Sequence, residues 1–144
     1  MRKVEVTAHD PRWQAAFKAE AESVLKALGN ENVVAVHHIG STAIPNIYAK
    51  PVIDLLVEVR SHEKLDERSG EMAAIGYEVM GEYGIAGRRY FRKSNELGVR
   101  THHVHAFESG SPEIKRHLAF RDYMIAHPHN AQRYRELKRQ LARA

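Results

Sequence analysis

Two segments of the chain carry residue types that could bind a phosphate or a cation. One is Gly40-Ser41, which follows a short apolar run, and the other is Asp54, which interrupts the apolar segment 51–59. Glycine lets backbone N–H groups approach a phosphate closely, and the serine hydroxyl can donate a further hydrogen bond. An ionised carboxylate in an apolar strand is costly unless it is paired or bound to a metal. These three residues are therefore candidates for a phosphate and cation site, although Gly-Ser turns and buried carboxylates also occur with purely structural roles.

A histidine-rich segment could supply further ligands. Residues 100–105 read Arg-Thr-His-His-Val-His, and in a strand His103 and His105 share one face because side chains alternate. Neutral imidazole is the commonest metal ligand in proteins, and histidine also contacts phosphate. Together with Asp54, the two histidines would form a mixed oxygen and nitrogen set, which suits Zn²⁺ or Mn²⁺, whereas Mg²⁺ prefers oxygen ligands alone. The alternative is a strand with scattered surface histidines.

Basic residues could neutralise an anionic ligand near these segments. Arg88, Tyr90 and Arg92 fall on one face of a predicted strand. Arginine binds phosphate or carboxylate through a bidentate fork, and a tyrosine ring can stack on a base. Lys50 stands just before the buried strand and could also reach a phosphate. The same residues could instead form solvated, charge-rich surface.

Composition and charge narrow the range of partners. The chain has 144 residues, a formal net charge of +4 and no cysteine. This length predicts one domain over residues 1–144, and the lack of cysteine excludes disulfides and thiolate metal sites. The basic excess favours an anionic small molecule or nucleotide, while the lack of a basic helix stripe interleaved with aromatics argues against nucleic acid. Without a signal-peptide pattern or an apolar stretch of about 20 residues, we expect a cytoplasmic protein that makes no membrane contact.

Hydrophobic periodicity predicts the elements that position these residues. A helix over 10–28, capped at Asp10, precedes strands over 33–36 and 51–59 with a polar loop between them. This order of elements predicts an α/β (α+β) fold with a mixed sheet flanked by helices. The remaining pattern predicts a helix over 62–75, strands over 77–80, 88–93 and 99–107, a helix opened by Ser111-Pro112-Glu113, and a last helix after Pro128 with Tyr134, Leu137 and Leu141 on one face.

Five ordered motifs, with a sixth at the start of the chain, resemble the GrpB family. They read His-Asp-Pro-Arg-Trp at 9–13, His-Ile-Gly-Ser-Thr-Ala-Ile-Pro at 38–45, Ala-Lys-Pro-Val-Ile-Asp at 49–54, Gly-Arg-Arg-Tyr-Phe-Arg-Lys at 87–93, His-His-Val-His at 102–105 and Phe-Arg-Asp-Tyr at 120–123. The resemblance covers nearly the whole chain and implies the nucleotidyltransferase-like superfold. In that superfold a Gly-Ser turn holds a triphosphate and carboxylates bind two Mg²⁺ ions. Related domains are fused to dephospho-coenzyme A kinases, but this chain has no Gly-x-x-x-x-Gly-Lys-[Ser/Thr] loop and no kinase activity is expected.

The chain departs from that superfold at the second carboxylate. Leu56 stands where an acid is expected, two residues after Asp54. Glu58 shares a strand face with Asp54, but four residues of strand place it about 13 Å away. We therefore expect a nucleotide or a phosphorylated small molecule to bind at Gly40, Ser41 and Asp54, with Mg²⁺, Zn²⁺ or Mn²⁺ and no organic cofactor. Nucleotidyl transfer, a non-catalytic binding domain and a His/Asp metal-dependent hydrolase all remain open.

Overall fold

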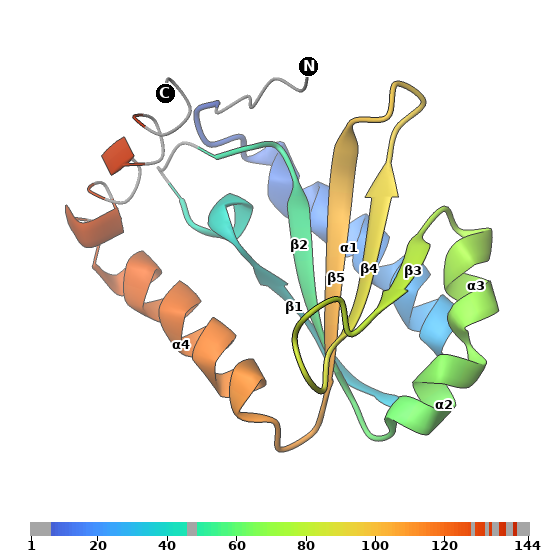
Figure 1. The fold of residues 1–144 in the computed structure, drawn as a ribbon. Helices are drawn as coiled ribbons and strands as arrows, with labels where there is room; N and C mark the ends of the chain where they lie inside the picture. Colours follow the sequence, from blue (N-terminus) through green and yellow to red (C-terminus); the bar gives the residue numbers. More distant parts are fainter. Residues whose placement is uncertain are drawn as a thin grey trace.

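The chain folds around a five-stranded mixed sheet with the strand order β1-β2-β5-β4-β3 (Figure 1). A computed structural model describes residues 7–45, 49–127, 129–131, 133, 136–137 and 140. β2 and β5 run parallel, and the other neighbouring strands are antiparallel. The strands are β1 (Val33–Ile39), β2 (Ile53–Val59), β3 (Glu78–Gly81), β4 (Arg89–Ser94) and β5 (Arg100–Glu108).

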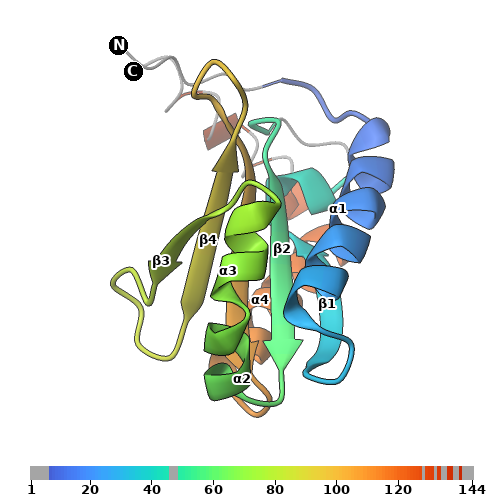
Figure 2. The same cartoon turned by 90° about the vertical axis from the view of Figure 1, so that its right-hand side faces the viewer.

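Helices cover both faces of this sheet. α1 (Arg12–Leu28), α2 (His62–Glu67) and α3 (Ser69–Ala74) pack on one face, and α4 (Pro112–Ala126) lies on the other (Figure 1 and Figure 2). A short 3-10 turn, η1 (Ser41–Ala43), follows β1. The arrangement confirms the predicted α/β fold with a mixed sheet flanked by helices.

Alternation along the strands divides the core into two apolar layers. The α4 face is apolar beneath α4, where Ile39, Leu56 and Phe107 pack against Ile114 and the partly buried Leu118. The rest of this face, over β5 and β4, carries polar and aromatic side chains. The larger layer, between the sheet and α1 to α3, includes Trp13, Val24, Leu28, Leu55, Val57, Leu65, Met72, Phe91, Val104 and Ala106.

Several element boundaries differ from the expected ones by one to three residues, and those of α1 and β1 have a clear physical reason. α1 begins at Arg12 with Pro11 as its N-cap, although the Asp10 carboxylate still accepts a hydrogen bond from the Arg12 backbone N–H at 2.9 Å. β1 continues to Ile39 because the residues after Val36, expected to form a loop, stay paired with β2. The strand therefore runs up to the Gly-Ser turn itself.

The helix expected over 62–75 is interrupted at Arg68. This residue has φ −100° and ψ 8°, which separates α2 from α3. Its guanidinium donates hydrogen bonds to the carbonyls of Ala27 at 3.0 Å and Lys26 at 3.3 Å. These carbonyls stand at the end of α1, where helical hydrogen bonding leaves them without a partner. The Arg68 side chain, at the junction of α2 and α3, thus joins both helices to the end of α1.

The last expected helix falls partly outside the described residues. Pro128, Tyr134 and Leu141 lie outside them, and Leu137 is exposed. In the part of the chain that the structure describes, the helices are too short or too polar to span a membrane.

Candidate functional site

The Asp54 carboxylate of β2 lies against two imidazoles of β5. The parallel pairing sets Asp54 opposite His103, and His105 lies two residues further along the same face. Oδ1 of Asp54 is 3.1 Å from Nδ1 of His103 and 3.4 Å from Nε2 of His105. The potential ligand atoms of the three residues lie within 4.8 Å of one another, and their side chains are between 16% and 27% exposed. We call this set the Asp54 cluster.

Opposing effects act on the pKa of Asp54. Burial raises it, whereas hydrogen bonds from His103 and His105, followed by their charges, lower it. The net result is a pKa below the ordinary value of 3.8. Asp54 is therefore a carboxylate at neutral pH, and such a group can accept hydrogen bonds or bind a cation through either oxygen.

Gly40 makes room for this carboxylate. It follows β1 with a φ of 75°, and a Cβ built on it would lie 2.6 Å from Oδ2 of Asp54. That separation is far below ordinary contact, so any side chain at position 40 would displace the carboxylate. Ser41 begins η1 directly after it. The Gly-Ser turn and the Asp54 cluster are thus neighbours, and the glycine seats the carboxylate in addition to forming the turn.

His38 supports the same turn from the opposite face of the sheet. Its ring stacks on Phe17 of α1 with centroids 4.7 Å apart, and its Nε2 lies 2.9 Å from Oγ1 of Thr42. The Thr42 hydroxyl donates to the carbonyl of Val52 at 3.1 Å. Because that hydroxyl has a single hydrogen, Nε2 of His38 must donate to it. His38 therefore holds η1 against the start of β2 and is not part of the Asp54 cluster.

We expect His38 to lower the stability of the fold as the pH falls from 6.5 toward 4. Burial lowers the pKa of His38 from 6.5 to about 4. Between pH 6.5 and about 4, His38 binds a proton in the unfolded chain but not in the folded chain. The free energy of unfolding therefore declines as the pH falls through this interval. Urea titrations across the interval should show a shallower pH dependence for His38→Gln than for the wild type, and equal slopes would contradict the assignment. Burial also lowers the pKa values of three other histidines, His37, His102 and His117. The stability of the His38→Gln variant will therefore still decline somewhat with falling pH.

Arg88 and Tyr90 lie beside the Asp54 cluster on its β4 side. Arg88 is 7% exposed, and its guanidinium stands over the Tyr90 ring, 4.6 Å from the centroid. It donates to Nδ1 of His105 at 3.3 Å and to the carbonyls of Glu82 and Tyr83. The Tyr90 ring, itself buried, also meets the rings of Tyr83 and His105, each at 5.3 Å. Tyr90 is thus enclosed by its neighbours, and the exposed ring in this region belongs to Tyr83.

Two further arginines have buried Nε groups that make no hydrogen bond within the described residues, and these are Arg92 and Arg100. Arg92 does reach the Tyr83 hydroxyl at 3.4 Å, and its Nε stands 3.5 Å from the Glu78 carboxylate, an ion-pair distance. Burial raises the pKa of Tyr90, whereas the charges of Arg100 and Arg92 lower it. Arg100 was not among the site residues predicted from the sequence. The feature that identifies Arg100 as a site candidate is a buried Nε without a partner, which can be recognised only in the folded chain.

Two further residues are placed by the structure: Lys50, a predicted phosphate contact, and His117, which was not predicted. Lys50 is exposed, and the ion pairs of Asp54 within the described residues are with the two histidines instead. His117 of α4 has its ring centroid 6.0 Å from that of His105. Sequence reasoning missed His117 because its approach depends on how α4 packs on the sheet, which no motif encodes.

The position of the missing second acid belongs to the core. Leu56 is fully buried in the apolar layer beneath α4. Glu58 is engaged elsewhere, because its carboxylate accepts a hydrogen bond from the Ser109 hydroxyl at 2.8 Å. Neither residue can add a carboxylate to the Asp54 cluster in this structure.

Comparisons with known proteins agree along nearly the whole chain. A family model described as "GrpB protein" matches residues 3–144. The chain is 52% identical to the UPF0157 protein YqkA of Bacillus subtilis, covering 98% of this chain and 40% of that protein. It is 36% identical to the UPF0157 protein PA4798 of Pseudomonas aeruginosa, covering 98% of this chain and 58% of that protein, so it spans less than two thirds of either relative. The crystal structure of the conserved protein GrpB from Enterococcus faecalis matches with a TM-score of 0.91 at 47% identity, covering 96% of this chain and 83% of that one.

Proposed function

This chain belongs to the GrpB family, and we propose that it binds a phosphorylated small molecule or nucleotide at the Asp54 cluster, together with a divalent cation. The observation that carries the proposal is the buried, unpartnered Nε of Arg100, whose charge, like those of Arg88 and Arg92, acts on Tyr90 beside that cluster. A cationic side and an anionic, imidazole-rich side meet there on one face of the sheet. That combination is suited to a ligand which carries negative charge and shares a cation with the protein.

The cationic side is formed by three arginines around Tyr90. The charges of Arg88, Arg92 and Arg100 all act on the Tyr90 phenol. A buried N–H group without a partner costs about 1–3 kcal/mol, which an accepting anion would offset. Guanidinium groups bind phosphate oxygens through paired, charge-assisted hydrogen bonds. A phosphoryl group therefore fits this region better than a neutral ligand does.

The Asp54 cluster has a donor set that fits a divalent cation. It offers one carboxylate and imidazole nitrogens, with the potential ligand atoms within 4.8 Å of one another. This mixture favours Zn²⁺ or Mn²⁺ over Mg²⁺, which prefers oxygen ligands. A cation at this position would supply Lewis acidity and offset the charge of a phosphate. Asp54 would be its anionic ligand, and Gly40 would keep that carboxylate in place.

Leu56 favours a binding role over two-metal nucleotidyl transfer. Transfer by two Mg²⁺ ions needs several carboxylates that face the same point. Here the second position is apolar and lies beneath α4, while Glu58 is bonded to Ser109. We therefore propose ligand binding as the function, and regard nucleotidyl transfer and metal-dependent hydrolysis as activities that an assay must detect independently.

Thermal-shift measurements test this proposal directly. Phosphate, pyrophosphate, AMP and ATP would each be added with and without Zn²⁺, Mn²⁺ or Mg²⁺. A ligand at a hundred times its dissociation constant adds about 2.7 kcal/mol, which in a domain of this size raises the midpoint by roughly 5–10 °C. We expect Arg100→Ala and Asp54→Ala to weaken binding at least tenfold.

Lys18→Ala is the matched control for the arginine variant. It also removes one positive charge, but from an exposed position on α1, on the opposite face of the sheet from α4. Binding by this variant should equal that of the wild type. If no anion stabilises the wild type, or if Lys18→Ala weakens binding as much as Arg100→Ala, the proposed site is wrong.

A further inference from the structure

The two ring nitrogens of His105 face different partners: Nδ1 faces the Arg88 guanidinium, and Nε2 faces the Asp54 carboxylate. Nδ1 of His105 lies 3.3 Å from the Arg88 guanidinium, and Nε2 of the same ring faces Asp54 at 3.4 Å. A guanidinium has only donors, so Nδ1 must present its lone pair to it. The hydrogen of the neutral imidazole is then on Nε2, from which it donates to the Asp54 carboxylate.

The orientation of Arg88 does not depend on His105. Its Nε donates to the carbonyl of Glu82 at 3.2 Å, a terminal nitrogen donates to the carbonyl of Tyr83 at 2.9 Å, and the guanidinium lies over Tyr90. Because Arg88 is also buried, it cannot turn away from His105 without giving up these contacts. The N–H group that meets Nδ1 is therefore fixed by the protein.

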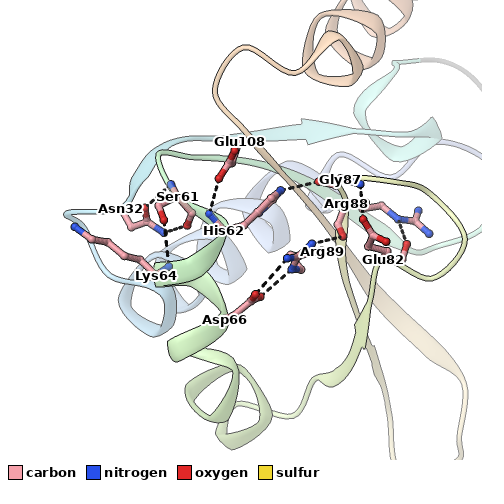
Figure 3. Close-up of polar contacts among 10 residues, drawn as sticks. All are labelled: Asn32, Ser61, His62, Lys64, Asp66, Glu82, Gly87, Arg88, Arg89 and Glu108. Atoms are coloured by element: carbon pink, nitrogen blue, oxygen red, sulfur yellow. Dashed lines mark hydrogen bonds and ion pairs between the residues drawn. The ribbon is translucent and has the colours of Figure 1, made fainter.

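The loop residue directly before Arg88, Gly87, is itself held in place by hydrogen bonds (Figure 3). The Glu82 carboxylate accepts from the Gly87 N–H at 2.6 Å, and the Gly87 carbonyl lies 2.6 Å from Nε2 of His62, which donates to it. Directly after Arg88, Arg89 pairs with Asp66 of α2 at 2.8 Å. These bonds anchor both sides of Arg88 to the rest of the fold.

Metal binding would require the opposite tautomer of His105. An imidazole that coordinates through Nε2 presents its lone pair there and carries its hydrogen on Nδ1, which metal-bound histidines donate to a carboxylate, carbonyl or water. Arg88 offers a donor at that position instead of an acceptor. We infer that Arg88 fixes His105 as a hydrogen-bond donor to Asp54 and keeps it out of the coordination of any cation.

This inference deepens the proposed function and rests on it for the presence of a cation. The cation is then held by Asp54 and His103, which has no such donor against it among the described contacts. His105 serves the carboxylate, or an anionic ligand, through its Nε2 hydrogen. Within the Asp54 cluster, Asp54 and His103 thus bind the cation, and His105 acts as a hydrogen-bond donor.

Arg88→Gln is the variant that should release His105. The glutamine amide can still donate to a loop carbonyl, and its own oxygen can accept from Nδ1 of His105. We expect this variant to bind Zn²⁺ at least tenfold more tightly than the wild type, as measured by competition with a chromophoric chelator. Adding His105→Ala should abolish the gain. In the wild-type background, His105→Ala should leave Zn²⁺ affinity within about twofold, whereas His103→Ala should lower it at least tenfold.

The tautomer itself is measured in the metal-free protein by two-bond ¹H–¹⁵N correlation spectra of the imidazoles. His105, assigned by its loss in His105→Ala, should show the Nε2–H pattern, which is also expected of His38. His127 is the internal control for the opposite pattern, because its Nδ1 donates to the Tyr123 carbonyl at 2.9 Å. In metal-free Arg88→Gln the Asp54 carboxylate still accepts from Nε2, so the His105 signals should move toward the pattern of His127 only when Zn²⁺ is added.

An Nδ1–H pattern for His105 in the wild type overturns the inference, as does a loss of Zn²⁺ affinity in His105→Ala equal to that in His103→Ala. The wild-type spectra need neither ligand nor metal, so they test the tautomer even if Arg88→Gln does not fold. The proposed function fails by a different result, namely the absence of any anion or cation that stabilises the wild type.

Discussion

Leu56→Asp is expected to destabilise the fold by about 4 kcal/mol or more, which lowers the unfolding midpoint by roughly 10 °C. The leucine is fully buried and packs among the apolar side chains of Ile39, Phe107 and Ile114. The substitution removes this packing and leaves a carboxylate without a partner beneath α4. Thermal and urea unfolding of the two proteins measure the difference.

The same variant tests whether the second acid of a two-metal site can be restored. If Mg²⁺ stabilised Leu56→Asp, or if the variant released pyrophosphate from nucleoside triphosphates, position 56 would be accessible to a cation and the described packing would be wrong. Leu56→Met is the matched control because it keeps the volume and the apolar character. It should cost less than about 1.5 kcal/mol.

Gly40→Ala should cost about 3 kcal/mol and abolish ligand and cation binding. One part of this cost comes from the φ of 75°, which favours glycine and makes alanine less stable by about 1 kcal/mol. The larger part comes from the 2.6 Å separation between the new Cβ and Oδ2 of Asp54. Overpacking of this kind costs roughly 1–3 kcal/mol, and here the neighbour that must move is the carboxylate of the site.

Gly98→Ala separates the two contributions to the Gly40→Ala result. Gly98 has a φ of 78°, close to that of Gly40, but a Cβ there would meet no atom within 4 Å. Its substitution should therefore cost only about 1 kcal/mol and leave binding intact. The double variant Gly40→Ala/Asp54→Ala should be less destabilised than the sum of the single variants, because removal of the carboxylate relieves the contact. Strict additivity would mean that the glycine does not seat Asp54.

The elements that could be predicted from the sequence are those set by local pattern. β2 is buried on both faces, so it reads as a nearly continuous apolar run, and alternation correctly assigns His103 and His105 to one face. The interruption at Arg68 could not be predicted, because it depends on carbonyls at the end of α1, over 40 residues away in sequence. The extension of β1 to Ile39 likewise depends on its partner strand.

The site was predictable in its residue types and less so in their roles. Asp54 stood out because a carboxylate in an apolar run needs a partner, but the identity of that partner depends on β5 lying next to β2. Arg88 was assigned to an anion from its charge alone, and its contact with His105 appears only when the loop before β4 is folded. Arg100 and His117 required the packed structure, since one is marked by an unpartnered Nε and the other by the placement of α4.

The parallel pairing of β2 with β5 also sets when the site forms during folding. Asp54 and His103 are 49 residues apart, and the intervening chain contains α2, α3, β3 and β4. Closing a contact over such a separation costs conformational entropy, so we expect these two strands to pair after the local contacts have formed. In any fragment that ends before residue 100, Asp54 lacks both histidines.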